Sequence, residues 1–417
     1  MKHGLLLGVL MGLFFITVSA DKAFAQDKDL YSFNVEEFEK KSWEWSGEFR
    51  LLGTNKTYNK NSVLHPLKFP DDEIDQSQEV ELQLYLESRW DWDWSRFFVS
   101  GEASVIRSSL EENDDETSFL SEGYLQLNLF DPQSFEIGKR LLRWGKGYAF
   151  NPVALMERVK NPEDPEASRE GLWITQGILI PGGFSIFENT SVTLVYLPIR
   201  EEINEDYQTR YEYDNVWGMK LYGLIGTTDF DLYLVEWTET SETDLGIDFA
   251  TNITPSFEVH GELAVFDTTE STEQQTLIGL RYLTENEITL IVEGFNDSSG
   301  LTYNESKELY QLIEVSPADK AKPYLSQIQQ KKTLNRNYGY LKISIKEPFD
   351  WLYFTPSFTW LGNLDDRSSS NALQLVYAPS DNLSYQLVLQ YLEGEKYSQF
   401  GENTVKNKVE LSASYDF

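Results

Sequence analysis

The feature that most constrains this chain is a two-residue period of apolar side chains. In residues 80–89, Val80, Leu82, Leu84 and Leu86 alternate with polar residues. Successive side chains of a β-strand point to opposite faces, whereas a helical face needs spacings of three and four. The alternation returns in 228–234, 256–265, 340–346, 382–391 and 409–417. The chain is therefore predicted to consist of strands with one apolar and one polar face.

The connections between these strands fall into a short and a long set. Short turns are expected near 91–94, 131–134, 181–190, 226–229, 254–256, 284–287, 347–350 and 378–382. Longer polar segments are expected at 53–77, 107–117, 145–171, 198–213, 237–243, 267–273, 297–336, 362–370 and 393–406. A β-sandwich does not require this sorting, but a transmembrane barrel does. We predict an all-β fold: an antiparallel up-and-down transmembrane barrel of about 18 strands, with short periplasmic turns and long extracellular loops.

The first 25 residues have the pattern of a secretory signal. Lys2 precedes an uncharged apolar run, and Ala23-Phe24-Ala25 is a small-residue cleavage pattern. The expected organisation is a signal peptide over 1–25, a short periplasmic segment over 26–42 and the barrel over 43–417. An outer-membrane location of a bacterial cell follows from this organisation.

The composition excludes several classes of protein. Asp and Glu number 68 against 35 Lys and Arg, so a nucleic-acid partner is not expected, because binding phosphates requires a basic surface. Cysteine is absent, which excludes disulfides and cysteine metal sites. After the signal, no run of about 18 apolar residues predicts a membrane helix. Aromatic residues make up 14%, and clusters such as Trp90, Trp92 and Trp94 predict a girdle at the membrane interface.

The polar faces of the strands predict what lines the lumen. Acids outnumber bases there, and rings of like charge bias which ions pass. The candidate wall residues are Glu79, Glu81, Glu136, Asp229, Asp231, Glu258, His260, Glu262 and Lys342. We expect a channel for passive passage or export of solutes that favours cations or neutral molecules. The alternative is a surface interaction protein whose loops bind a partner and whose barrel is an anchor.

Residues 136–158 bring positive charge into an acidic protein. Arg140, Arg143 and Lys146 follow one another there, among glycines that are unusual in a plain strand and that permit a bend. One interpretation is a constriction at which Arg140 and Arg143 contact lumen carboxylates or solute. The other is a structural bend whose arginines pair with neighbouring Glu residues.

The same stretch resembles a motif of alginate-export-like outer-membrane porins, G-[KR]-x-x-x-x-W-G-x-G-x-x-x-N-P. The matching residues are Gly138, Lys139, Trp144, Gly145, Gly147, Asn151 and Pro152. The resemblance implies a barrel of about 18 strands. It implies less about the solute, because the alginate exporter has a basic pore and the predicted wall of this chain is acidic.

No catalytic or metal site is predicted, and no cofactor is expected. His260 lies between Glu258 and Glu262 on a strand, but no nucleophile motif accompanies it, so it is interpreted as a wall residue rather than a proton-transfer group. A membrane-embedded hydrolase acting through His260 is the minor alternative.

Two of the long segments are expected to contain helices. In 297–336, Leu309, Leu312 and Ile313 share a helical face, and a second helix would carry Tyr324, Leu325 and Ile328. In 145–171 a short helix is expected over 152–159. Segments of this length are usually functional, and one of them is expected to fold inward and narrow the pore. For 297–336 the alternative is a cap on the surface.

The last residues predict a membrane address. Tyr415 and Phe417 continue the apolar face of the final strand, and a terminal aromatic residue resembles the signal read by the bacterial barrel-assembly machinery. The expected partners are therefore outer-membrane lipids and this machinery. The choice between monomer and homotrimer, and the identity of the solute, stay open.

Overall fold

The computed structural model describes residues 42–70, 74–110, 113–130, 132–205, 214–267, 271–329 and 333–417. The expected signal peptide and residues 26–41 lie outside the described residues, so these two expectations stay predictions. Among the described residues, no helix is long and apolar enough to cross a membrane.

The described chain forms one sheet of 18 strands that closes on itself. Each strand pairs antiparallel with its neighbours in sequence, and β1 pairs with both β2 and β18. The strands are β1 (Trp43–Tyr58), β2 (Gln76–Asp91), β3 (Ser95–Ser108), β4 (Asp115–Phe130), β5 (Gln133–Arg140), β6 (Leu172–Leu179), β7 (Asn189–Ile199), β8 (Asp214–Ile225), β9 (Thr228–Trp237), β10 (Glu242–Thr254), β11 (Phe257–Asp267), β12 (Thr272–Leu283), β13 (Ile288–Asp297), β14 (Asn337–Ile345), β15 (Phe354–Asn363), β16 (Ser368–Ser380), β17 (Leu383–Glu393) and β18 (Val405–Asp416). The predicted fold class and strand number are confirmed.

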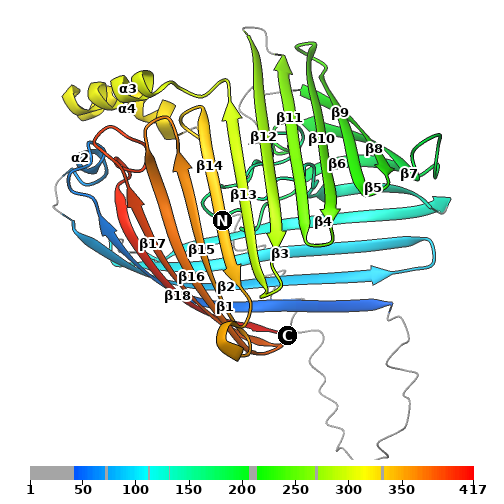
Figure 1. The fold of residues 1–417 in the computed structure, drawn as a ribbon, viewed down its shortest axis with the longest axis horizontal. Helices are drawn as coiled ribbons and strands as arrows, with labels where there is room; N and C mark the ends of the chain where they lie inside the picture. Colours follow the sequence, from blue (N-terminus) through cyan, green and yellow to red (C-terminus); the bar gives the residue numbers. More distant parts are fainter. Residues whose placement is uncertain are drawn as a thin grey trace, which may run out of the picture.

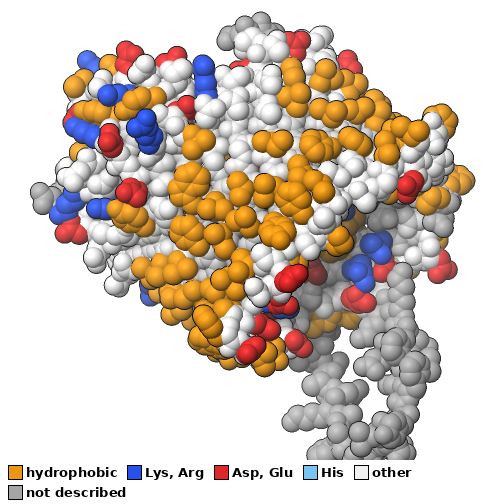
Figure 2. All heavy atoms as spheres, in the orientation of Figure 1, with side chains coloured by type: hydrophobic (Ala, Val, Ile, Leu, Met, Phe, Trp, Pro, Cys, Tyr) orange, Lys and Arg blue, Asp and Glu red, His pale blue; other side chains and the backbone are white. Residues whose placement is uncertain are grey.

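The two faces of the strands differ as the alternation predicts. Leu82, Leu232 and Leu411 are 44%, 50% and 60% exposed on the outside, whereas Asp231 is fully buried on the inside. Figure 2 shows apolar side chains gathered over the outer surface of the strands. An apolar exterior of this kind needs a lipid environment, because exposure of this much apolar surface to water is unfavourable.

Short turns and long connections lie at opposite ends of the barrel, which we call the turn end and the loop end. At the turn end, Trp92 and Trp94 are each more than half exposed in the β2–β3 turn, and Trp43 stacks on Trp90 with 6.4 Å between ring centroids. A short 3-10 helix (Pro348–Asp350) lies in the β14–β15 turn.

Helices gather at the loop end, where Figure 1 shows α2, α3 and α4 beside one another. They are α2 (His65–Lys68), α3 (Tyr303–Val315) and α4 (Ala318–Gln329). Thr302 caps α3 in a capping box with Glu305, and the helices share an apolar cluster that includes Tyr310 and Leu334. The two helices predicted in 297–336 are confirmed, and this segment caps the loop end.

Candidate pore constriction

The connection between β5 and β6, residues 141–171, folds into the barrel and is the constriction segment of this chain. Its Trp144, Leu155 and Met156 are buried against inward-facing side chains of β7, β8 and β9, such as Leu197 and Val235. Further along, Phe150 stacks on Phe295 of β13 at 4.5 Å between ring centroids, and it belongs to a cluster with residues of β12, β14, β15 and β17. The segment therefore covers a large part of the inner wall.

The segment has no helix over 152–159, which corrects the prediction. Residues 150–157 form a series of turns in which Val153, Leu155 and Met156 are all fully or almost fully buried. Pro152 cannot donate a backbone hydrogen bond, and the backbone N–H of Val153 donates to Glu262 of the wall (3.3 Å) rather than within a helix. Wall contacts replace the local hydrogen bonds that a helix would have supplied.

Two carboxylates of the wall hold the backbone of the constriction segment. Glu262 on β11 accepts hydrogen bonds from the N–H groups of Lys146, Gly147 and Val153. Glu293 on β13 accepts from the N–H groups of Tyr148 and Ala149 (2.8 Å for Ala149). Both carboxyl groups are almost completely buried. Because hydrogen bonds to charged acceptors are stronger than neutral ones, this pair fixes the start of the segment against the wall.

A lysine of the segment completes the anchor. The Nζ of Lys146 lies 2.8 Å from Asp231 on β9, and Lys220 on β8 lies 3.2 Å from the same carboxylate. The Nζ of Lys160 donates to the carbonyl oxygens of Gly147 and Tyr148, and burial lowers the pKa of Lys160 from its ordinary value. Charged groups that sequence analysis placed on the pore surface thus bind the segment instead.

Glu157 is buried in the middle of the segment. It accepts hydrogen bonds from the Trp144 N–H (3.1 Å) and from Asn151 Nδ2 (3.4 Å), and Arg169 lies at 3.3 Å. Burial raises the pKa of Glu157 to about 7, against the opposing effect of Arg169 and the Trp144 amide. The segment therefore contains a carboxyl group that titrates near neutral pH.

His260 lies behind the segment, fully buried. Its Nε2 is 3.0 Å from Glu293, its Nδ1 is 3.4 Å from Glu258, and the ring edge of Tyr148 lies against it. The prediction that Glu262, His260 and Asp231 line the open lumen is corrected, because the segment covers them. His260 is a buried wall group without access to solute.

The two arginines of the sequence motif have different surroundings. Arg140 donates to Glu122 (2.8 Å) and to Glu136 (3.2 Å) and lies over the ring of Tyr124, as the structural bend would require. Arg143 is exposed and makes no ion pair with any described residue. The contacts of Arg140 fit the structural bend, whereas the exposed Arg143 takes no part in them.

The other candidates lie along the wall. Glu79 pairs with Lys56 (2.6 Å), and Glu81 accepts from Gln83 (2.9 Å). Asp229 accepts from the hydroxyl of Tyr222. Lys342 on β14 lies 2.6 Å from Glu166, so it holds the far part of the constriction segment to the opposite wall.

A cavity of about 270 Å³, which we call the constriction niche, lies between the segment and strands β2 to β4. The wall contributes Tyr85, Ser100, Ser121 and Glu122, and the segment contributes Leu141, Arg143 and residues 165–169. These side chains are separated by up to about 80 positions in the sequence, and the tertiary structure brings them together.

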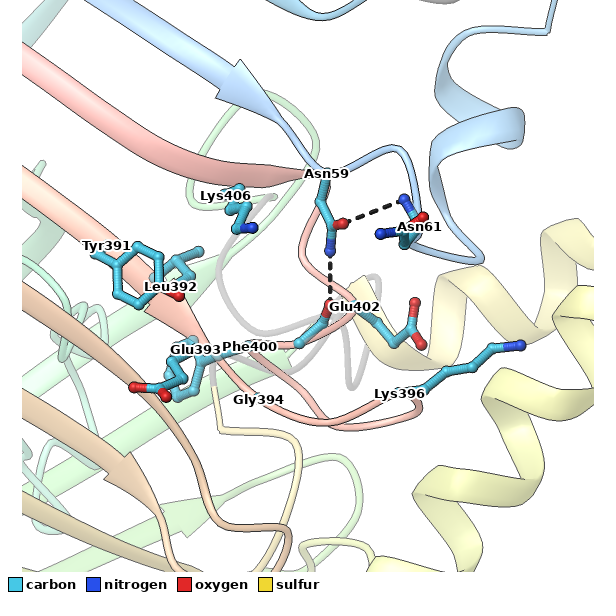
Figure 3. A pocket seen from close by; sticks show the side chains of 11 residues that line it. Asn59, Asn61, Tyr391, Leu392, Glu393, Gly394, Lys396, Phe400, Glu402 and Lys406 are labelled. Atoms are coloured by element: carbon cyan, nitrogen blue, oxygen red, sulfur yellow. Dashed lines mark hydrogen bonds between the residues drawn. The ribbon is translucent and has the colours of Figure 1, made fainter.

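A second cavity of about 380 Å³ lies at the loop end, between Asn59, Glu393 and Lys406. In Figure 3, Lys406 and Asn59 approach it from β18 and the β1 end, while Lys396 points away toward the helices. Lys396 pairs there with Glu314 of α3 at 2.6 Å.

Comparison with solved structures shows the same barrel. OccK9 (OpdG) of Pseudomonas aeruginosa superposes with a TM-score of 0.55 at 9% identity, covering 90% of this chain and 98% of that one. A BenF-like porin from Pseudomonas fluorescens gives 0.54 at 8%, covering 90% and 98%. OccK11 (OpdR) of Pseudomonas aeruginosa gives 0.53 at 11%, covering 90% and 96%.

Identities this low show the fold alone. The chain has the architecture of an 18-stranded bacterial outer-membrane porin barrel. No protein-family model matches the sequence, and no curated protein matches it.

Proposed function

We propose that this protein is a passive channel for small solutes across the bacterial outer membrane. The observation that carries the proposal is the cavity between the constriction segment and the β2–β4 wall, inside a closed barrel with an apolar exterior. A barrel of this size is wider than a side-chain core needs, and here one inward-folded segment fills only part of it. Nothing in this arrangement requires an energy source.

The charges of the uncovered wall favour cations or neutral solutes. Glu81, Glu87 and Glu102 project from the inner faces of β2 and β3, and within the described chain none of them pairs with a base. Neighbouring acids are neutralised by their own partners, as Glu48 is by Arg50 at 2.8 Å. Three uncompensated carboxylates on one side of a narrow opening repel anions and attract cations.

A planar bilayer experiment in a salt gradient tests the proposal. With potassium chloride at different concentrations on the two sides, the reversal potential should have the sign of a cation-preferring pore. Replacing Glu81 and Glu102 with Gln should move it toward zero. A clear anion preference would refute the charge argument, and the absence of any conductance would refute the channel.

We also propose that this chain is related to the alginate-export-like porins. Its support is that the motif residues Trp144, Gly147 and Asn151 form the buried start of the constriction segment. An acid-rich wall is unsuited to a polyanion, so alginate itself is not proposed as the solute.

A surface interaction protein is the second candidate. The observation in its favour is the helical cap at the loop end, with the adjoining cavity of Figure 3. A barrel that stays closed to ions in the bilayer experiment would support this candidate over the channel.

We also propose that Tyr415 and Phe417 act as the signal for the barrel-assembly machinery. Tyr415 is exposed on the lipid face of β18, as such a signal requires. Replacing Phe417 with Ala should lower the amount of folded barrel in the outer membrane, and unchanged amounts would count against this role.

A further inference from the structure

The constriction niche has polar groups that lack partners within the described part of the chain. Ser121 is the extra residue of a β-bulge in β4, it is 5% exposed, and its Oγ has no hydrogen-bond partner among the described residues. Arg143 lines the same cavity and forms no ion pair with any described residue. A buried hydroxyl without a partner costs free energy, so the niche is suited to a ligand that supplies one.

The formal charge of the niche is zero. Two carboxylates, Glu122 and Glu166, stand against two guanidinium groups, Arg143 and Arg169. Three of these four are already satisfied: Glu122 by Arg140, Glu166 by Lys342 and Arg169 by Glu157. A charged solute would lose hydration here and gain little in exchange.

A neutral hydroxylated solute avoids this cost. The hydroxyl-bearing residues Tyr85, Ser100, Ser121 and Ser168 line the cavity together with Arg143. Hydroxyls both donate and accept, and guanidinium donates in a fixed fork. Anions are repelled on approach by Glu81, Glu87 and Glu102. A cation gains little from binding in the niche, because its carboxylates Glu122 and Glu166 already pair with Arg140 and Lys342.

We propose that the constriction niche is a binding site for neutral polyhydroxylated solutes of the size of a monosaccharide or a short polyol. This inference rests on the proposed channel function and names the solute class that the channel would select. Ser121 and Arg143 are the residues that contact the solute. The cavity of about 270 Å³ holds one such molecule rather than an oligomer.

The test is the block of ion current by added solute in planar bilayers. Glucose and sorbitol should reduce the potassium current of the native protein in a saturable way. Ser121→Ala and Arg143→Gln should each raise the concentration for half-block at least threefold. Ser412→Ala is the matched control, because Ser412 is a wall serine on β18 that is also largely buried (9% exposed) and lies outside the niche. Its half-block should equal that of the native protein.

Three further probes decide between solute classes. Glycine as a zwitterion, putrescine as a cation and acetate as an anion should block more weakly than glucose. Stronger block by any of them, or a half-block for glucose that Ser121→Ala leaves unchanged, would overturn the inference. Current without saturable block by glucose would also overturn it while leaving the channel intact, whereas the absence of current would remove the channel itself. Heat-dependent migration in gels confirms that each variant is folded.

Discussion

At the scale of single residues, the carboxylates of the inner wall have two different roles. Glu262 and Glu293 are buried, and their oxygens accept hydrogen bonds from backbone N–H groups of the constriction segment. Glu81 and Glu102 face the uncovered lumen and pair with no base among the residues that the structure describes. All four alternate with apolar residues in the same way. Their local sequence therefore does not show which carboxylates bind the constriction segment and which face the lumen.

Replacing Glu262 with Gln should loosen the constriction segment. The amide keeps one acceptor but brings an N–H group toward three N–H donors, so about 2 kcal/mol of anchoring should be lost. Single-channel conductance should rise and become noisier. Glu410→Gln is the control, because it removes one wall carboxylate that pairs with Lys408 on the same strand and that accepts no hydrogen bond from the described residues of the segment. Equal conductance changes in the two variants would show that charge alone, and not anchoring, is responsible.

At the scale of elements, the constriction segment behaves as a small core attached to the wall. Its apolar side chains join two clusters of the lumen. Glu157 accepts a hydrogen bond from the N–H of Trp144 in one of these clusters, and burial raises its pKa to about 7. The pKa in the packed segment is above the ordinary value of 4.5, so the packed form binds the proton more tightly than an opened form. This contribution to packing is complete below about pH 4.5 and is lost as the pH rises through 7.

Opening of the segment should therefore increase between pH 5 and pH 8. The measurement is the frequency of large-conductance events in planar bilayers at fixed salt over that range. Glu157→Gln mimics the neutral carboxyl group and should remove this part of the pH dependence. A native profile that is flat, or one that the variant reproduces, would contradict the role of Glu157.

At the scale of the whole molecule, closure of the barrel depends on the seam between β1 and β18. Gly47 and Phe417 exchange backbone hydrogen bonds of 3.0 and 2.9 Å, and the Phe417 ring lies over Gly47 and edge-on to Trp45. A Cβ at position 47 would lie 2.7 Å from the ring and 2.8 Å from the backbone oxygen of Tyr85. Only glycine leaves room for the aromatic ring at this point of the seam.

Gly47→Val should destabilise the seam by about 1–3 kcal/mol, the usual cost of overpacking. The temperature at which the folded band disappears in heat-modifiability gels should fall. Gly53→Val on the same strand is the control, because a Cβ there meets only the Leu411 oxygen at 3.9 Å. Adding Phe417→Ala to Gly47→Val should recover part of the loss, and the absence of any difference between the two valine variants would contradict the account.

The sequence by itself determined the barrel. Alternation in stretches such as 80–89 and the sorting of connections into short and long sets predicted the strands, the lipid-facing side chains and the helices of 297–336, because these features depend on neighbours within a few residues. The tertiary structure alone decided that 141–171 folds inward. Gly147 meets Glu262 across 115 positions and Tyr148 meets Glu293 across 145, and no local pattern encodes such pairs. That long-range packing decides which wall residues stay exposed to solute. The candidate site therefore depends on the tertiary structure, whereas the fold class follows from local sequence patterns.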